Sequence, residues 1–336
     1  MSSQSCLLCE TVQINAHDTM LILNSASDPF IQQITQPGTD HTLLLAEDNI
    51  AAAKAVEVSL QNRKTILQHI AFHDSTLHHQ PGTVDVAVMN LLYQPGTAWI
   101  VHGLQLAAYA LRPGGRLYVT GAKERGILST AKRMQTMFGN VETLLISKGH
   151  RAVCSQKLPD RPLLEPTQDV TVFASSKLDE GTRQLISVLD VHATDEALDI
   201  GCGVGFLGLH IARLATRGYV SMVDVSLAAV AVAEQAVEQS GLTNVRVLAS
   251  DGTEAVRDQR FDLVVTNPPF HLGGIHTLDI AERFMRETAQ ILRPQGRFYL
   301  VANRFLKYEP ALRTHFKHVE EVGGDTRYKV IRAQLS

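Results

Sequence analysis

The chain has 336 residues, of which 45% are hydrophobic and 19% charged, and its formal net charge is −3 at pH 7. This length suggests two domains, each large enough for its own core, and the composition excludes a disordered or collagenous chain. No apolar run reaches the roughly 18 residues that span a bilayer, and the start lacks the pattern of a signal peptide, so we expect a cytoplasmic protein without a membrane partner.

The first residues contain Cys6 and Cys9 as a Cys-x-x-Cys pair, while Cys154 and Cys202 stand alone. A structural zinc ion needs four ligands, and no second pair completes the set. We therefore expect no metal site. The two thiols are expected to be reduced and to lie near a mobile terminus.

Further along the first half, short apolar runs alternate with helical patterns, which is typical of an α/β domain. The expected strands are 42–46, 84–89 and 115–120, with a terminal antiparallel hairpin of 141–147 and 151–155. Residues 158–169 are proline-rich and aperiodic, so they are the expected linker between domains 1–157 and 170–336.

The second half alternates more regularly, which predicts a parallel sheet with helices such as 227–237 on both faces. The expected strands are 196–200, 219–224, 244–249, 261–266 and 296–302. A last pair, 317–322 and 327–334, is joined by Gly323-Gly324-Asp325. This link is too short for a parallel crossover and predicts an antiparallel hairpin.

The chain also contains an internal echo. Residues 84–97 resemble 261–274, and residues 111–119 resemble 292–300, after a spacer only four residues longer in the second copy. Two motifs that recur in order at similar spacing indicate a duplication. We therefore expect two tandem Rossmann-like domains, each doubly wound and mostly parallel with a C-terminal antiparallel hairpin.

A glycine-rich loop runs from Asp199 to Gly208 between a predicted strand and a predicted helix. Its glycines allow the backbone to turn and to approach a nucleotide-type cofactor at the carboxyl edge of the sheet. Gly203, Gly205 and Gly208 also fit the dinucleotide fingerprint, which is weak by itself. The acid ahead of the glycines favours S-adenosylmethionine, because a carboxylate there can accept hydrogen bonds from its cationic methionine end.

Two further acids end the next strands. Asp224 is placed to accept both ribose hydroxyls, and Asp251, followed by Gly252, is placed to meet the adenine amine. One such acid often only caps a helix or stabilises a turn, but three in these places favour a cofactor site. The expected cofactor-binding residues are Asp199, Gly201, Gly203, Gly205, Asp224, Asp251 and Gly252.

Asn267-Pro268-Pro269-Phe270 follows the fourth strand and is the expected catalytic segment. The Asn267 side-chain carbonyl and the Pro268 backbone carbonyl can accept the two N–H groups of a conjugated nitrogen and so align its lone pair. The prolines fix φ and remove competing donors. Phe270 offers a face for a flipped base. The alternative is a Pro-Pro turn that closes a strand, with Phe270 in the core.

The first copy lacks both features. We place its segment 45–50, Leu-Ala-Glu-Asp-Asn-Ile, opposite the glycine loop, and it contains no glycine. Leu91 and Leu92 replace the two prolines. The first copy should bind neither the cofactor nor a methyl acceptor.

These motifs resemble those of the duplicated ribosomal RNA guanine-N2 methyltransferases, especially the small-subunit enzymes. The resemblance covers nearly the whole chain and is most specific at Phe173 with 179–182, at 267–273, at 301–309 and at 327–333. It implies a catalytic second domain and a first domain that helps to bind RNA or supports folding. It also implies that Asn267, Pro268 and Phe270 position guanine, and that cofactor is bound by Asp199, Gly201, Gly203, Asp224 and Asp251.

The expected function is transfer of a methyl group from S-adenosylmethionine to guanine N2 in ribosomal RNA, with 16S rRNA or the small subunit as partner and a monomeric enzyme. A related large-subunit enzyme has the same architecture, so the guanosine stays open. Asn-Pro-Pro-aromatic loops also serve adenine N6 and protein glutamine amides. A non-catalytic RNA-binding assembly factor is the rival from another class.

Two sets of basic residues are candidates for contacts with the RNA backbone, since phosphate contact needs only Lys or Arg near the path of the strand. We expect both sets near the cleft, although such runs often form only a solvated helix face. They are Lys123, Arg125, Lys132 and Arg133 in the first copy, and Arg304, Lys307, Arg313 and Lys317 in the second.

Overall fold

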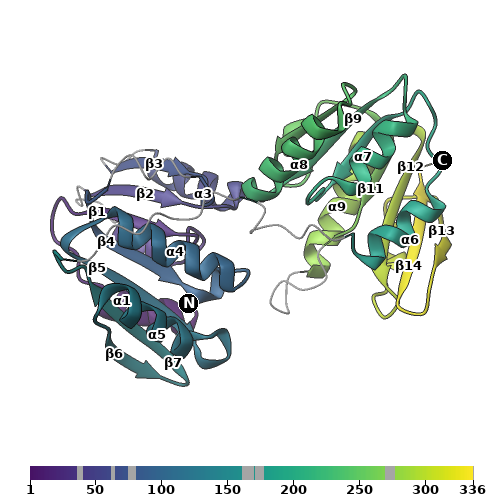
Figure 1. Cartoon of the computed structure of the whole chain (residues 1–336). Coiled ribbons are helices and arrows are strands. Elements are labelled where there is room, and N and C mark those ends of the chain that lie inside the picture. The colour runs from purple at the N-terminus through teal and green to yellow at the C-terminus, as the bar shows by residue number, and fades with distance from the viewer. Residues whose placement is uncertain are drawn as a thin grey trace. The chain divides into compact units, whose positions relative to one another are not determined.

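The computed structural model describes residues 1–35, 41–61, 65–74, 81–160, 170, 178–268 and 277–335. The chain divides into two compact units, Met1–Phe173 and Ala174–Ser336. Within the described ranges each unit forms a seven-stranded sheet with helices on both faces (Figure 1). None of the described helices is long and apolar enough to cross a membrane. The predicted linker 158–169 lies largely outside these ranges, so its bounds stay a prediction.

The first unit has its strands in the order β3-β2-β1-β4-β5-β7-β6. Strands β1 to β5 are parallel, and β6 and β7 form the antiparallel hairpin. In chain order the elements are α1 (Ser3–Thr11), β1 (Thr19–Leu23), α2 (Phe30–Ile34), β2 (Thr42–Ala46), α3 (Ile50–Leu60), β3 (Ile66–Ile70), β4 (Val84–Asn90), η2 (Leu91–Tyr93), α4 (Thr97–Ala110), β5 (Leu111–Ala122), η3 (Lys123–Arg125), α5 (Ile127–Phe138), β6 (Glu142–Ser147) and β7 (His150–Gln156).

The second unit repeats this arrangement in the order β10-β9-β8-β11-β12-β14-β13. Its strands are again parallel up to the antiparallel hairpin of β13 and β14. The elements are α6 (Glu180–Val188), β8 (Glu196–Ile200), α7 (Phe206–Leu214), β9 (Tyr219–Asp224), α8 (Leu227–Ser240), β10 (Val245–Ala249), η5 (Glu254–Val256), β11 (Phe261–Thr266), α9 (Thr277–Ile291), β12 (Leu292–Asn303), α10 (Glu309–Arg313), β13 (His318–Gly324) and β14 (Tyr328–Gln334).

The two sheets agree in register as well as in order. Val84 pairs with Leu111 before the register shifts, and Phe261 pairs with Leu292 before the same shift. The predicted fold class, with two tandem doubly wound units and terminal hairpins, is confirmed. Two strands were not predicted: β1, a run of only five residues, and β3, whose Ile66 is 65% exposed at the sheet edge.

The position of the missing glycine loop needs correction. The loop follows β8, whose counterpart by strand order is β1, so the equivalent segment of the first unit is 24–28 and not 45–50. Residues 45–50 contain the end of the next strand, β2, and correspond to the segment around Asp224. The segment 24–28 reads Asn-Ser-Ala-Ser-Asp and also lacks glycine. The inference that the first copy has lost the loop therefore stands on a different segment.

Of the two expectations for the N-terminal thiols, that they are reduced agrees with the structure, and that they lie near a mobile terminus was wrong. Cys6 and Cys9 lie in helix α1, and both are partly buried and unoxidised. Leu8 from the same helix belongs to the core of the first unit, so this part of the chain is packed rather than a mobile terminus. Across the described ranges no three His, Cys, Asp or Glu side chains form a group that could hold a metal ion.

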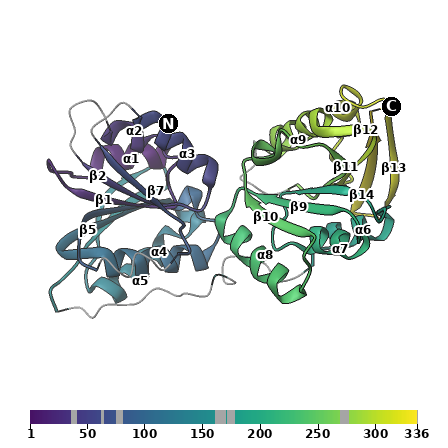
Figure 2. The same ribbon diagram turned by 90° about the horizontal axis from the view of Figure 1, so that it is seen from above.

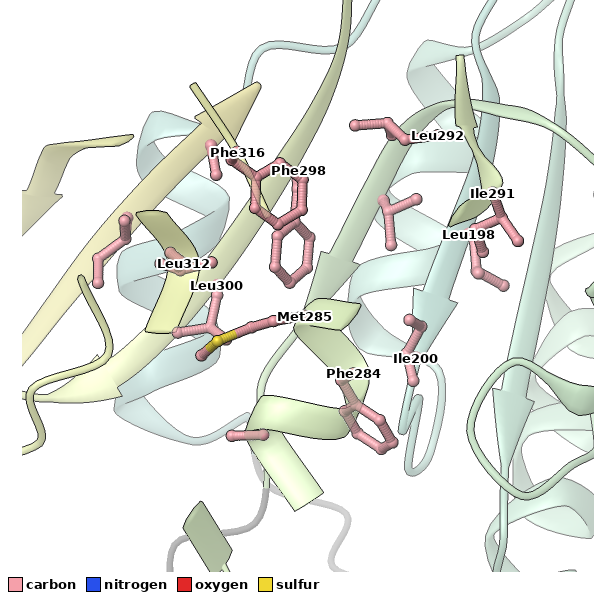
Figure 3. Packing of buried hydrophobic residues seen from close by; sticks show 14 of the residues in the cluster. Leu198, Ile200, Phe284, Met285, Ile291, Leu292, Phe298, Leu300, Leu312 and Phe316 are labelled. Carbon is pink, nitrogen blue, oxygen red and sulfur yellow. The ribbon is translucent and has the colours of Figure 1, made fainter. Parts of the chain in front are cut away.

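Two apolar layers cover the second sheet. In Figure 2, α9 and α10 lie on one face and α6, α7 and α8 on the other. Figure 3 shows the first layer, in which Phe298 of β12 stacks on Phe316 with ring centroids 5.6 Å apart. Met285 from α9 packs beside them on Leu300. Burial of both faces fixes the strands and hence the loops at their ends.

Local sequence sets the boundaries of α8, the helix that packs on β9 and β10. Ser226 caps the start of α8 by accepting a hydrogen bond from the Ala229 N–H, and Gly241 closes its end in the left-handed conformation with φ of 68°. Both are preferred solutions for unpaired groups at helix ends. Ala228 and Ala233 are fully buried, and such small side chains leave room for close packing on the sheet.

Candidate active site

The second sheet gathers the predicted residues at the carboxyl edge of its parallel strands. Asp199 lies in β8, Asp224 ends β9, and Asn267 follows β11, which pairs with β8. Asp251 and Gly252 follow β10, the next strand beyond β9. In doubly wound folds, ligands bind outside this edge where the strand order reverses, which is here between β8 and β11.

The glycine loop leaves open space at this point. Gly201, Gly203 and Gly205 have φ values of 71°, 55° and 91°, in the left-handed region that favours glycine. A Cβ atom at Gly201 or Gly203 would meet nothing within 4 Å. The loop therefore combines a turn that needs glycine with room for a ligand against its backbone. Gly205 ends the loop and caps α7.

Asp199 is fully buried, and its Oδ2 accepts a 2.9 Å hydrogen bond from the Gly208 N–H. Its Oδ1 has no hydrogen-bond partner among the described residues. Burial, together with the nearby Asp224 carboxylate, raises the pKa of Asp199 to about 7. Because a buried acceptor without a donor is costly, the position suits a ligand that brings a cationic N–H group.

Asp224 ties the loop to the following helix. Its Oδ2 accepts a 2.8 Å hydrogen bond from the Gly203 N–H, and its Oδ1 accepts one of 2.9 Å from the Ser226 N–H. Burial raises the pKa of this carboxyl. Since a carboxylate has roughly four acceptor sites, and backbone N–H groups of Ser226, Gly203 and Val225 use three of them, the side chain retains capacity for a ribose hydroxyl.

Asp251 is paired with Arg283, which was not among the predicted site residues. Arg283 of α9 donates from Nη1 to Asp251 Oδ2 at 2.9 Å and from Nη2 to Oδ1 at 2.5 Å. This hydrogen bond to Asp251 raises the pKa of Arg283. Glu287, one helical turn on, accepts from the Thr253 N–H at 3.0 Å, and a Cβ atom at Gly252 would clash with its carboxylate. In the sequence, the i, i+4 spacing of Arg283 and Glu287 was the one feature that could have indicated these two residues.

The Asn267 side chain is oriented by two residues of the segment that opens α6. Its Nδ2 lies 3.1 Å from each oxygen of Asp179 and 2.8 Å from Thr182 Oγ1. Its Oδ1 is buried and has no hydrogen-bond partner among the described residues. Pro268 is buried beside it. Pro269 and Phe270 lie outside the described residues, so their predicted roles stay predictions.

The equivalent edge of the first unit keeps the acid that follows the second parallel strand but lacks the glycine loop. Glu47 stands where Asp224 stands, and it accepts hydrogen bonds from Ala26 and Asn49 as Asp224 does from Gly203 and Ser226. Burial raises the pKa of Glu47 to about 7. The buried Phe72, which follows β3, stacks on Trp99 with ring centroids 5.4 Å apart. Aromatic side chains thus fill this part of the first unit.

The candidate RNA contacts lie at different edges. Arg304 and Lys307 follow β12 at the carboxyl edge, although Arg304 is paired with Glu321 at 2.9 Å. The Lys317 N–H donates to the carbonyl of Gln334, which pairs with Arg297 near the start of β12. Lys317 therefore lies at the amino edge, away from Asn267, contrary to the expected place near the cleft. The four basic residues of the first unit are exposed.

The open glycine loop and the buried, unpaired Asp199 oxygen fit the methionine end of S-adenosylmethionine, and Asp224 fits its ribose. Together with the doubly wound sheet and its terminal hairpin, they define the class as an S-adenosylmethionine-dependent methyltransferase. Residues 164–332 match the family described as methyltransferase small domain.

Similarity to known proteins shows which kind of methyltransferase this chain is. The ribosomal RNA small subunit methyltransferase C of Shewanella pealeana is 29% identical over 351 residues, with 98% of each chain covered. That of Shewanella halifaxensis is 31% identical, with 79% of this chain and 83% of its own length covered. The T. thermophilus 16S rRNA N2 G1207 methyltransferase (RsmC), solved with AdoMet and guanosine, has a TM-score of 0.84 and 29% identity, with 100% of this chain and 92% of its own covered. The chain belongs to the methyltransferase small domain family and is an rRNA methyltransferase of this kind.

Proposed function

We propose that the second unit transfers a methyl group from S-adenosylmethionine to the exocyclic N2 of a guanine in 16S ribosomal RNA. One observation carries the proposal. Asp199 and Asn267, on the adjacent strand ends of β8 and β11, each hold a buried oxygen that has no donor among the described residues. Because native structures rarely leave buried acceptors unpaired, two at one edge indicate ligands that bring N–H groups.

The first of these oxygens belongs to the cofactor side. Asp199 Oδ1 accepts from the ammonium group of the methionine end, the backbone of 201–205 lies along the ligand, and Asp224 accepts from the ribose. When bound, S-adenosylmethionine supplies a methyl group made electrophilic by the sulfonium. Asp251, already bound by Arg283, has lone pairs left for the adenine amine.

The second oxygen belongs to the acceptor side. The lone pair of guanine N2 is delocalised into the ring. The nitrogen therefore attacks well only when its two N–H groups are held so that the lone pair points to the methyl group. Asn267 Oδ1 accepts one of them, and the Pro268 carbonyl is the proposed acceptor for the other. Phe270 is proposed to stack on a base that leaves the RNA helix. These groups orient the nitrogen and need not change their own protonation.

The RNA itself is held by other parts of the chain in this proposal. Lys123, Arg125, Lys132 and Arg133 of the first unit are exposed and can contact phosphates, which bind without reading sequence. The first unit then acts as a non-catalytic support for RNA binding or folding. We propose that the protein works as a monomer in the cytoplasm, on rRNA or on the small subunit.

Mass spectrometry of nucleosides tests the proposal. Purified protein is incubated with S-adenosylmethionine and either 16S rRNA or small subunits that lack the modification, and the RNA is digested. N2-methylguanosine is the expected product. N6-methyladenosine in the RNA, or methylglutamine in the subunit proteins, would replace the proposed acceptor with one of the other conjugated nitrogens. No methylated product with either substrate would contradict the enzyme proposal.

A further inference from the structure

We propose that Asp179 and Thr182 are positioning residues that hold the Asn267 amide in one orientation, with its carbonyl oxygen presented to the methyl acceptor. The inference rests on the proposed function of Asn267 and extends it to α6, an element outside the acceptor loop. It concerns which way a side-chain amide points, a choice that decides whether the acceptor nitrogen meets an oxygen or an NH₂ group.

The chemistry of the contacts allows only one orientation. Asn267 Nδ2 lies 3.1 Å from both oxygens of Asp179. An ionised carboxylate accepts hydrogen bonds and donates none, so an amide that faces it must face it with nitrogen. Turning the amide over would place Oδ1 against the carboxylate and lose these bonds. The orientation thus follows from donor and acceptor types, which is the ground on which such amides are assigned.

Thr182 provides the second contact that orients the amide, and we call Asp179 and Thr182 together the lock. Its hydroxyl donates to Asp179 Oδ2 at 2.7 Å, so the lone pairs of Oγ1 remain for Asn267 Nδ2 at 2.8 Å. The amide nitrogen has two hydrogens, one for the carboxylate and one for this hydroxyl. Both donors are satisfied, and Oδ1 is left pointing away from α6 without a partner among the described residues.

Asp179 and Thr182 are themselves fixed by the helix. Asp179 is the N-cap of α6, and its Oδ1 accepts a 3.0 Å hydrogen bond from the Thr182 N–H. The Thr182 side chain is buried. A residue that must satisfy the helix start has little freedom to turn away, so the cap delivers a carboxylate at a set place. The first turn of α6 thereby orients a side chain that is distant in sequence.

The first unit holds its asparagine amide through different residues. Residues of equal order in α1 are Ser2, the N-cap, and Ser5, whose N–H donates to Ser2 Oγ at 3.1 Å. No carboxylate stands there. Asn90, the counterpart of Asn267, donates instead to Asp28 at 2.6 Å, and its Oδ1 accepts from the Leu92 N–H at 2.9 Å. The Asn90 amide thus also faces a carboxylate with its nitrogen, but this carboxylate comes from another segment, and the amide oxygen is used by the backbone.

Two substitutions remove the lock while they keep the helix cap. Asp179→Ser retains a capping oxygen but no carboxylate, and Thr182→Val keeps the shape of threonine without the hydroxyl. We expect single-turnover methyl transfer at saturating cofactor to fall roughly 10²-fold for Asp179→Ser, the scale of a small misplacement of a reacting group. Thr182→Val should cost about tenfold, and Thr182→Ser should restore the rate. The Kd for S-adenosylmethionine should be unchanged.

The deciding readout is a double-mutant cycle with Asn267→Ala. If the two residues act through the amide, Asp179→Ser and Thr182→Val have no further effect on the rate once Asn267 is alanine. Additive losses, or full activity of both single variants, would overturn the inference. Failure of the proposed function is a separate result, because the wild-type enzyme would then yield a product other than N2-methylguanosine.

Discussion

The two units share a fold and differ in which polar atoms are free. Strand order, strand register and the acid after the second parallel strand recur, with Glu47 in one unit and Asp224 in the other. In the first unit the amide oxygen of Asn90 is bound by the chain itself, whereas that of Asn267 has no partner among the described residues. Apolar burial and strand register are enough to keep the fold. The site is lost when the asparagine oxygen accepts a hydrogen bond from the chain itself.

Proline explains part of this difference. The donor that occupies Asn90 Oδ1 is the N–H of Leu92, two residues on. The residue two after Asn267 is Pro269, which lies outside the described ranges but has no N–H to give. The sequence Asn-Pro-Pro therefore cannot form the hydrogen bond that occupies the amide oxygen of Asn90 in the first unit.

The largest expected effect comes from filling the glycine loop. Gly203→Arg should abolish binding of S-adenosylmethionine, since the side chain would enter the open space beside the loop. Gly241→Arg is the matched control. Gly241 has a similar positive φ and similarly open surroundings, but it ends α8 away from the strand ends that hold the site. Isothermal titration should show no binding for the first variant and near-normal binding for the control.

The second comparison uses the paired asparagines. Asn267→Ala should slow methyl transfer by roughly 10²–10³, the cost of deleting one positioned polar group from an active site, with cofactor binding retained. Asn90→Ala should leave the rate unchanged. Single-turnover assays with saturating cofactor measure both. A normal rate for Asn267→Ala would make its loop structural, and a slow Asn90→Ala enzyme with intact stability would give the first unit a part in the chemistry.

RNA binding should depend on the exposed basic residues of the first unit. Neutralising Lys123, Arg125, Lys132 and Arg133 together should weaken RNA binding and reduce the slope of log K against log salt by about 0.7 to 0.9 for each phosphate that the protein no longer neutralises. The Kd for S-adenosylmethionine should not change. Arg313→Gln with Lys317→Gln, at a groove on the amino edge, serves as control and should keep the slope. If the slope is unchanged in the first variant, its four basic residues do not contact phosphates and only form a solvated surface.

The last expected effect is on the pH dependence of the free energy of unfolding. Both units should contribute to it, and bound cofactor should remove only the contribution of the second unit. Burial raises the pKa of both Glu47 and Asp199 to about 7. Since folding favours their protonated forms, the stabilisation is present at low pH and is lost as the pH rises from about 4 through 7, at up to about 1.4 kcal/mol per pH unit for each group.

Denaturant titrations across this range, with Glu47→Gln and Asp199→Asn, should assign one contribution to each unit. Saturating S-adenosylmethionine should flatten the Asp199 contribution, because a cationic ligand favours the carboxylate, and should leave that of Glu47 in place. Flattening of both would mean that the first unit binds the cofactor too.

The sequence was a good guide to the fold because apolar runs and the echoed motifs report directly on buried strands. It predicted the hairpins, the parallel strands of the second half and the edge at which Asp199, Asp224 and Asn267 lie. It failed at β1 and β3, where short or half-exposed strands carry little periodicity. The misplaced counterpart of the glycine loop followed from missing β1, since β2 was then matched with β8, whereas β4 and β5 were matched correctly with β11 and β12.

The site was harder to complete from sequence. Arg283 and Asp179 lie far along the chain from Asp251 and Asn267, and only the packing of α9 and α6 against the sheet brings them together. Spacing within a motif cannot report such pairs. That one amide oxygen is free and its counterpart is bound follows in part from Pro269, which has no N–H, and otherwise depends on donor geometry that the residue types do not give.

The claim that one of two copies works is tested most directly by counting cofactor sites. Equilibrium titration of the intact chain with S-adenosylmethionine should give one site per chain, because only the second unit combines the open glycine loop with an unpaired buried Asp199 oxygen among the described residues. Gly203→Arg should reduce the count to none. Two sites per chain, or one site that survives Gly203→Arg, would contradict this account.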